Sequence, residues 1–334
     1  MLTNPKNMMF LLTLTGGTMI SMSATSWYGA WIGLEINLLS FIPLISKINN
    51  QRTTEAALKY FLVQALASSM IMFSLLSMIM MNFKIQYIIL NSALLLKMGA
   101  APFHIWLPEV MEGMEWINCI LLMTIQKLAP TTLLSYSISQ TNFLMNTSII
   151  LSALIGAFGG LNQTSMRKIM AFSSINHLSW IIISMKISDS AWMTYLTAYI
   201  MLTTASSLMF LTYKLYYLTQ LFTSNTTPIP KMALFTSLLS LGGLPPFLGF
   251  MPKWLIITKM TEVMNIIMIS TMIMMSLLTL YYYLRISMSA LTLNYNNSIQ
   301  PLMINNKHEH IISMIIIIMS IFGLILSYPM IMMF

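Results

Sequence analysis

Long apolar runs recur along the whole chain, and short stretches that carry the polar and charged residues separate them. Most of these runs extend over about 18 to 25 residues, which is long enough for an α-helix to cross a lipid bilayer. A transmembrane β-barrel would instead require alternating apolar and polar residues in shorter segments. Runs such as IIMFSLLSMIMM and IISMIIIIMSIFGLIL show no such alternation. The pattern therefore predicts an all-α polytopic membrane protein.

About 11 transmembrane helices are predicted from the runs and from the helix-breaking residues between them. The loops are short, and the longest, at about 287–310, is too small for a soluble catalytic domain. We therefore expect a single transmembrane domain over residues 1–334, with repeat-like halves at about 25–165 and 166–334. The approximate limits of the predicted helices are 8–22, 28–45, 57–81, 85–107, 117–137, 147–161, 171–185, 192–213, 233–258, 264–286 and 311–332.

The basic residues are distributed unequally between the two sides of the predicted membrane. With 11 helices the two ends of the chain lie on opposite sides, and about nine Lys or Arg residues fall on the side of the N-terminus against about three on the other. Lys and Arg are enriched on the inside face of membrane proteins. The N-terminus is therefore predicted on the inside face and the C-terminus on the outside face.

Composition narrows the class of protein further. Of the 334 residues, 57% are hydrophobic and only 7% are charged, whereas a soluble domain carries about 25% charged residues. Cys119 is the single cysteine, which excludes an intrachain disulfide and a cysteine framework for zinc or an iron–sulfur cluster. The net charge of +8 comes from scattered residues, so no nucleic-acid patch is expected. Neither a cleavable signal or transit peptide nor a phosphate-binding, dinucleotide, flavin or haem motif is recognised, so we expect no cofactor and no metal.

Two segments of the sequence echo one another. GAAPFHIWLP and GLPPFLGFMP share two prolines, a glycine and a phenylalanine at one offset of 144 residues. Proline inside a helix removes a hydrogen bond and clashes with the preceding turn, so each segment predicts a broken helix. Such a pair is typical of a repeat-based transporter core, although two unrelated proline kinks would give the same letters. The predicted helix-break residues are Gly99, Pro102, Pro108, Gly243, Pro245, Pro246 and Pro252.

Four ionisable residues lie within or beside the predicted helices, namely Glu35, Lys97, Lys127 and Lys253. Each charge at the centre of a membrane costs about 2.5 to 3.5 kcal/mol, so all four require an explanation. They could pair with one another or with carbonyls freed at the breaks, which would fix helix packing only. Alternatively they could mark a proton or ion pathway, because a buried lysine, unlike an arginine, can exchange its proton. His177 in FSSINHLSW is either an interhelical hydrogen-bonding residue or a proton relay.

Five ordered motifs then carry a resemblance to a known family. WIGLEINLLSFIP, LLLKMGAAPFHIWLPEV, IQKLAP, GGLNQTSMRKIMAFSSINHLSW and LSLGGLPPFLGFMPKW are similar to the antiporter-like subunits in the membrane arm of respiratory complex I, the NADH–ubiquinone oxidoreductase. The resemblance covers residues from about 27 to about 284. It implies an inverted-repeat bundle in which each repeat contains one discontinuous helix. It also implies a core subunit of the H⁺-translocating NADH:ubiquinone reductase, with no electron-transfer chemistry in this chain.

The resemblance further implies roles for individual residues in proton translocation. Glu35 matches a carboxylate that pairs with a lysine in the first half, and Lys97 matches the lysine beside the first broken helix. Lys127 matches the central lysine and Lys253 the terminal lysine, while His177 matches a polar residue of the hydrophilic axis. Quinone reduction elsewhere in the complex would disturb the Glu35–Lys97 interaction. Protons would then redistribute through Lys127 towards Lys253 over bridging waters.

The same resemblance implies a location and partners. We expect the mitochondrial inner membrane, with the N-terminus on the matrix side and the C-terminus on the intermembrane-space side. Expected partners are subunit 4L on one side and subunit 4 on the other, accessory subunits, and phospholipids including cardiolipin. Other subunits would handle NADH, flavin, iron–sulfur clusters and ubiquinone. Two alternatives stay open, namely a stand-alone cation/proton antiporter and a non-transporting assembly scaffold of the membrane arm.

Overall fold

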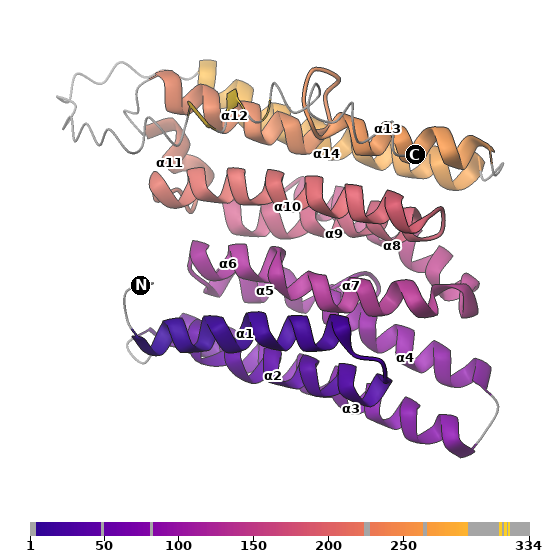
Figure 1. Ribbon diagram of the computed structural model, residues 1–334. Coiled ribbons are helices and arrows are strands. Elements are labelled where there is room, and N and C mark those ends of the chain that lie inside the picture. The colour runs from indigo at the N-terminus through magenta and orange to yellow at the C-terminus, as the bar shows by residue number, and fades with distance from the viewer. Residues whose placement is uncertain are drawn as a thin grey trace. The chain divides into compact units, whose positions relative to one another are not determined.

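A computed structural model gives the fold of the chain (Figure 1). It describes residues 5–47, 50–80, 83–223, 228–262, 266–292, 314–315, 317–318 and 320. The named elements in these ranges are helices, which confirms the predicted all-α class. The chain divides into two compact units, Met1–Ser152 and Ala153–Phe334.

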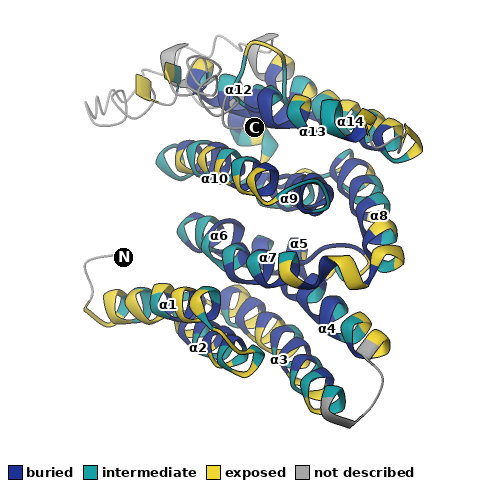
Figure 2. Cartoon of the chain, turned by 45° about the vertical axis from the view of Figure 1, so that its right-hand side comes forward, coloured by how far each residue is buried: buried dark blue, intermediate teal, exposed yellow. Residues whose placement is uncertain are grey.

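Unit 1 is a bundle in which successive helices pack against one another. Helices α1, α2 and α3 lie side by side, and α3 continues the packing onto α4 and α5 (Figures 1 and 2). Figure 2 shows many exposed residues on α1. The helices are α1 (Pro5–Ser23), α2 (Trp27–Ile45), α3 (Gln51–Met80), α4 (Phe83–Met98), α5 (Trp106–Gly113), α6 (Trp116–Met123), α7 (Ile125–Ser137), the 3₁₀ turn Ile138–Gln140 and the first part of α8 (Asn142–Gly160).

Unit 2 is built around α9, whose residues are buried along nearly the whole length of the helix. A helix buried on all sides carries apolar or hydrogen-bonded residues around its circumference, and α9 fits this description. It packs against α10, α13 and α14. The helices after α8 are α9 (Met166–Met185), α10 (Asp189–Thr212), α11 (Leu218–Thr223), α12 (Pro228–Gly242), α13 (Phe250–Glu262) and α14 (Ile266–Thr292).

Six helical segments in the described part of the chain are long and apolar enough to cross a membrane, which establishes a multi-pass membrane protein. The total of 11 stays a prediction. The last predicted helix, 311–332, lies outside the described residues except for five positions. The six segments are Trp27–Ile45, Gln51–Met78, Trp116–Gln140, Asn142–Gly160, Asp189–Thr212 and Ile266–Met288.

One helix predicted as continuous is interrupted. The predicted segment 117–137 consists of α6 and α7, which meet at Thr124, where the backbone leaves the helical region with φ −112° and ψ −81°. The Thr124 hydroxyl donates to the carbonyl of Ile120 at 2.7 Å, a bond that bends helices. Pro130 follows within α7 and has no amide hydrogen to donate to a carbonyl of the preceding turn. Together the two residues weaken the helix at this point.

Candidate functional site

The first interruption follows α4 and is built on a glycine. Gly99 has φ +75°, a left-handed conformation that glycine adopts without steric cost. The amide of Ala100 donates to the carbonyl of Leu95 at 3.0 Å, and the amide of Gly99 donates to that of Leu96 at 3.1 Å. These two bonds form a Schellman cap, which ends a helix by satisfying its last carbonyls. Helix α5 resumes at Trp106.

The second interruption repeats this backbone arrangement 144 residues later. Gly243 has φ +84°, its amide donates to Ser240 at 3.1 Å, and the amide of Leu244 donates to Leu239 at 3.4 Å. A turn bond from the amide of Phe247 to Leu244 matches the bond from Phe103 to Ala100, both at 2.9 Å. The echo in sequence is therefore also an echo in backbone hydrogen bonding.

Two of the predicted break residues lie inside helices rather than in the interruptions. Pro108 is the third residue of α5, and Pro252 is the third residue of α13. The first amide groups of a helix have no intrahelical acceptor, so proline is tolerated in this turn. Pro108 and Pro252 thus mark where the helices resume, while Pro102, Pro245 and Pro246 lie between the helices.

Lys97 is the penultimate residue of α4, directly before the first interruption, and only 7% of it is exposed. Its carbonyl accepts a hydrogen bond from Nε2 of Gln64 at 3.3 Å. The neighbouring carbonyl of Leu96 accepts from Nε1 of Trp106 at 3.1 Å, which joins the helices on both sides of the break. Among the described residues, Glu35 on α2 forms no direct ion pair with Lys97.

Lys127 is the third residue of α7, directly after the interruption at Thr124, and 3% of it is exposed. Beside it, Gln126 donates from Nε2 to Oδ1 of Asn37 at 2.6 Å, and its Oε1 accepts from the hydroxyl of Tyr60 at 3.3 Å. This amide chain links α2, α3 and α7 across the interior of unit 1. The sequence reasoning missed it, although Asn37 and Gln126 are polar residues in apolar runs, which in membrane helices signal interhelical hydrogen bonds.

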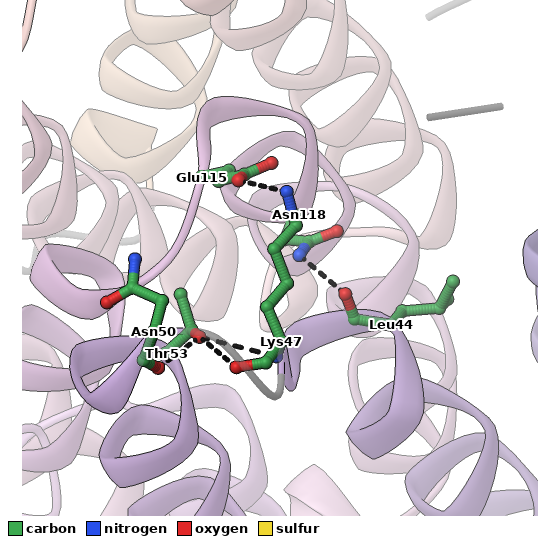
Figure 3. Close-up of polar contacts among 6 residues, drawn as sticks. All are labelled: Leu44, Lys47, Asn50, Thr53, Glu115 and Asn118. Carbon is green, nitrogen blue, oxygen red and sulfur yellow. Dashed lines mark hydrogen bonds and ion pairs between the residues drawn. The ribbon is translucent and has the colours of Figure 1, made fainter.

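A polar clasp, formed by Leu44, Lys47, Thr53, Glu115 and Asn118, holds one end of unit 1 together (Figure 3). Lys47 forms an ion pair with Glu115, the residue directly before α6. Nδ2 of Asn118 donates to the carbonyl of Leu44 at 2.8 Å, and the hydroxyl of Thr53 accepts from the amide of Lys47 at 3.3 Å. The clasp therefore fixes the start of α6, just after α5, against the end of α2 and the start of α3.

Lys253 is the fourth residue of α13, just after the second interruption, and 6% of it is exposed. Its Nζ donates to the carbonyl of Gly242, the last residue of α12, at 2.9 Å. It also lies 6.0 Å from the centre of the Trp180 ring. The negative end of the α12 dipole and the face of an aromatic ring both favour a cation at this position.

His177 lies on α9 and is 5% exposed, and its Nδ1 is 2.8 Å from the hydroxyl of Tyr195 on α10. The ring of Tyr199 lies 5.2 Å from the imidazole. A bond of 3.4 Å from Nδ2 of Asn176 to Oγ1 of Thr279 joins α9 to α14. The sequence did not reveal the tyrosines of α10 as neighbours of His177, because they lie on the next helix and only the fold brings them beside the imidazole.

Two buried polar atoms on α9, Asn176 Oδ1 and Trp180 Nε1, form no hydrogen bond with the other described residues. Buried polar groups are almost always hydrogen-bonded, and ordered water satisfies those that the protein does not. In the described part of the chain, no group of three His, Cys, Asp or Glu side chains could hold a metal ion.

Comparison with known proteins gives consistent matches. A model of the family described as NADH:quinone oxidoreductase/Mrp antiporter, TM, matches residues 24–92 and 79–279. NADH-ubiquinone oxidoreductase chain 2 of Anopheles gambiae is 48% identical over 330 residues, which is 96% of this chain and 96% of that protein. The same chain of Aedes aegypti is 48% identical over 332 residues, with 96% of each covered.

A solved structure resembles the fold over nearly the whole chain. A chain of respiratory complex I from Thermus thermophilus with bound aureothin superposes with a TM-score of 0.87 at 20% sequence identity. The match covers 98% of this chain and 80% of that chain. At this identity the likeness concerns the fold alone, and that fold is an antiporter-like bundle of membrane helices.

Proposed function

The chain belongs to the NADH:quinone oxidoreductase/Mrp antiporter transmembrane family, and we propose on this premise that it is a proton-translocating membrane-arm subunit of respiratory complex I. One observation carries the proposal. Among the described residues three lysines are buried, and each lies within four residues of a helix end at an interruption: Lys97 at the end of α4, Lys127 at the start of α7 and Lys253 at the start of α13.

The interruptions explain how a membrane interior can hold these charges. A continuous helix satisfies its own backbone, whereas an interrupted one offers carbonyl and amide groups to a side chain or to water. Lys253 makes use of such a carbonyl at Gly242. A lysine whose charged form is stabilised by backbone dipoles can release its proton when a neighbouring charge changes. The stability of the charged form is a balance of modest electrostatic contributions, so a change in one of them can shift that balance.

We place the proton path through both units in sequence. Glu35 and Lys97 respond to quinone reduction elsewhere in the complex, Lys127 passes the change on, and Lys253 with His177 completes the path in unit 2. The amide chain beside Lys127 and the buried Asn176 Oδ1 and Trp180 Nε1 of unit 2 support this proposal, because buried polar groups of this kind can hold ordered water. The redox cofactors and ubiquinone belong to other subunits.

The wider setting is part of the same proposal. We place the chain in the mitochondrial inner membrane with 11 transmembrane helices, of which α4–α5 and α12–α13 are discontinuous, and with the N-terminus on the matrix side. Its neighbours are subunits 4L and 4, accessory subunits and phospholipids including cardiolipin. The names of the insect relatives support the placement within this enzyme.

Replacement of Lys97 by methionine tests the function. The Lys97→Met complex should reduce quinone more slowly and move fewer protons per NADH oxidised, while NADH oxidation by an artificial acceptor should stay unchanged. Lys6→Met, at an exposed position of α1, is the matched control. It should leave quinone reduction, the number of protons moved per NADH and NADH oxidation unchanged. A Lys97→Met complex that assembles normally and pumps at full stoichiometry would contradict the assignment.

A stand-alone cation/proton antiporter is the second candidate, because the matching family also covers Mrp antiporters. It predicts that the isolated chain in liposomes exchanges cations for protons without NADH or quinone. A subunit of the complex should show no exchange under these conditions. A non-transporting scaffold, in contrast, predicts that Lys97→Met lowers assembly of the membrane arm but leaves proton stoichiometry intact.

A further inference from the structure

A groove of about 500 Å³ opens in unit 1 beside the first helix interruption, and none of the three buried lysines lines it. Its walls are formed by α4 and α8, and its inner end is formed by the segment between α4 and α5. The residues that define it are Lys84, Ile88, Leu95, Phe103, Phe143 and Leu151. Because most of the lining is hydrocarbon, the groove suits an apolar chain rather than a polar solute.

The lining changes from polar to apolar along the groove. Lys84 is the second residue of α4 and is exposed, and Gln140 and Asn142 lie at the same end, where α4 contacts the 3₁₀ turn. Asn91, on α4 between Lys84 and Leu95, holds α4 against the end of α7 by donating to the carbonyl of Ser137 at 3.1 Å. From Lys84 to Leu95 the helix rises by about 16 Å, at 1.5 Å per residue. The groove thus runs from a polar, basic end to an apolar end near the membrane interior.

We propose that this groove binds an anionic phospholipid, with the phosphate at Lys84 and one acyl chain along α4 and α8 as far as Pro102 and Phe103. This inference rests on the proposed function, which includes phospholipids among the neighbours of the chain, and it adds the site and the charge of the headgroup. A lysine near a helix end keeps its ammonium in the headgroup region while its methylene stem covers apolar surface. Among the described residues no carboxylate forms an ion pair with Lys84. Its positive charge is therefore available to a phosphate. A neutral helix of a partner subunit carries no phosphate, so the charge of Lys84 favours a phospholipid as the occupant of the groove.

Photocrosslinking of the assembled complex in phosphatidylcholine nanodiscs tests the proposal. One probe is phosphatidylglycerol with a diazirine near the end of its acyl chain, and the other is the matching phosphatidylcholine. The phosphatidylglycerol probe should label peptides containing Phe103 or Leu151 more strongly than the phosphatidylcholine probe. Lys84→Gln should reduce that labelling about fivefold, which corresponds to the roughly 1 kcal/mol that one surface lysine contributes.

Two further variants make the result decisive. Lys6→Gln, also exposed in unit 1, should leave the labelling unchanged. Leu151→Trp fills the groove and should abolish labelling by both probes. Equal labelling by the two probes, or labelling that Lys84→Gln does not change, would overturn the proposal. Absence of labelling from the assembled complex would also overturn it, because a protein helix would then occupy the groove.

Discussion

The two helix interruptions have the same backbone and opposite chemistry. Ten residues after the left-handed glycine, the first interruption carries Glu109 and the second carries Lys253. Glu109 points outward and pairs with Lys59 at 2.7 Å, with about half of each side chain exposed. Lys253 turns inward to the carbonyl of Gly242. The carbonyl end of a helix attracts an ammonium group and repels a carboxylate, so the sign of the charge decides the direction of the side chain.

Each interruption combines two features, the end of a helix and a buried lysine nearby, and these two features are set by different residues. Glycine and the Schellman hydrogen bonds end the helix in both units, whatever side chain follows. The buried lysine is then supplied from different places: Lys97 precedes the first glycine, and its equivalent in unit 2 is Leu241. The break is therefore a common frame, and the position of the charge is set separately in each unit.

A reciprocal charge exchange tests this separation with the largest expected effect. Lys253→Glu places a buried carboxylate against a carbonyl and should lower the free energy of unfolding by about 3 to 5 kcal/mol, the cost of an uncompensated buried charge. Glu109→Lys should have a small effect, because that position is open to the surroundings. Equilibrium unfolding in mixed micelles measures both.

Lys253→Met is the control for the exchange, because it removes the charge without adding a new one. It should cost less than Lys253→Glu, since it leaves only the carbonyl of Gly242 without its side-chain donor. Equal losses for Lys253→Glu and Glu109→Lys would show that the inward direction of Lys253 does not depend on its charge.

Parts of this arrangement could be predicted from the sequence and parts could not. The glycines and prolines of the two echoing segments indicated interruptions, and α4 and α12 end next to Gly99 and Gly243. That each pair of helices makes one membrane crossing stays a prediction. The interruption at Thr124 was missed, because a threonine in an apolar run bends a helix only when its hydroxyl bonds back to a carbonyl.

The direction of a side chain also could not be predicted, because it depends on neighbours from distant parts of the chain. Nothing near Glu109 in the sequence announces Lys59, and the two meet only because α5 packs on α3. In the same way, burial of Lys253 was expected from its position after the break, whereas its acceptor at Gly242 required the fold.

The two glycines themselves should respond differently to alanine. A Cβ at Gly99 would lie 2.6 Å from Cδ1 of the buried Leu107, whereas a Cβ at Gly243 would lie 3.0 Å from the flexible Nζ of Lys253. A left-handed backbone costs an L-residue about 1 to 2 kcal/mol, and overpacking adds about 1 to 3 kcal/mol. Gly99→Ala should therefore lower the free energy of unfolding by about 2 to 5 kcal/mol, and Gly243→Ala, where the flexible lysine can move aside, by about 1 to 2 kcal/mol.

The outcome for Gly243→Ala has a second readout. The new methyl group displaces Nζ of Lys253 from the carbonyl of Gly242. Proton translocation in the assembled complex should therefore fall by a larger fraction of the wild-type value than the free energy of unfolding does. Serine at either position serves as a control for size, since its Cβ is the same and its hydroxyl adds little volume. A Gly99→Ala protein as stable as the wild type would contradict the close packing at Leu107.

Two tyrosines extend the comparison to the polar networks of the units. Tyr195 bonds His177 at 2.8 Å, whereas Tyr60 bonds Gln126 at a longer 3.3 Å. Removing one partner of a buried hydrogen bond costs about 1 to 3 kcal/mol. Tyr195→Phe should lie within this range and Tyr60→Phe near its lower limit, measured by unfolding in micelles. A larger loss for Tyr60→Phe would place the stronger network in unit 1.

The smallest effect concerns how the helix after each interruption is held. In unit 2 the lysine of α13 itself bonds to α12, whereas in unit 1 the ion pair between Lys47 and Glu115 holds the chain just after α5. Both partners are about one-third exposed, so their coupling should be about 0.2 to 1 kcal/mol. A double-mutant cycle with Lys47→Gln and Glu115→Gln measures this coupling, which should decrease as salt increases. A coupling of several kcal/mol that salt does not change would mean that the pair is desolvated, and the first interruption would then depend on a buried charge as the second does.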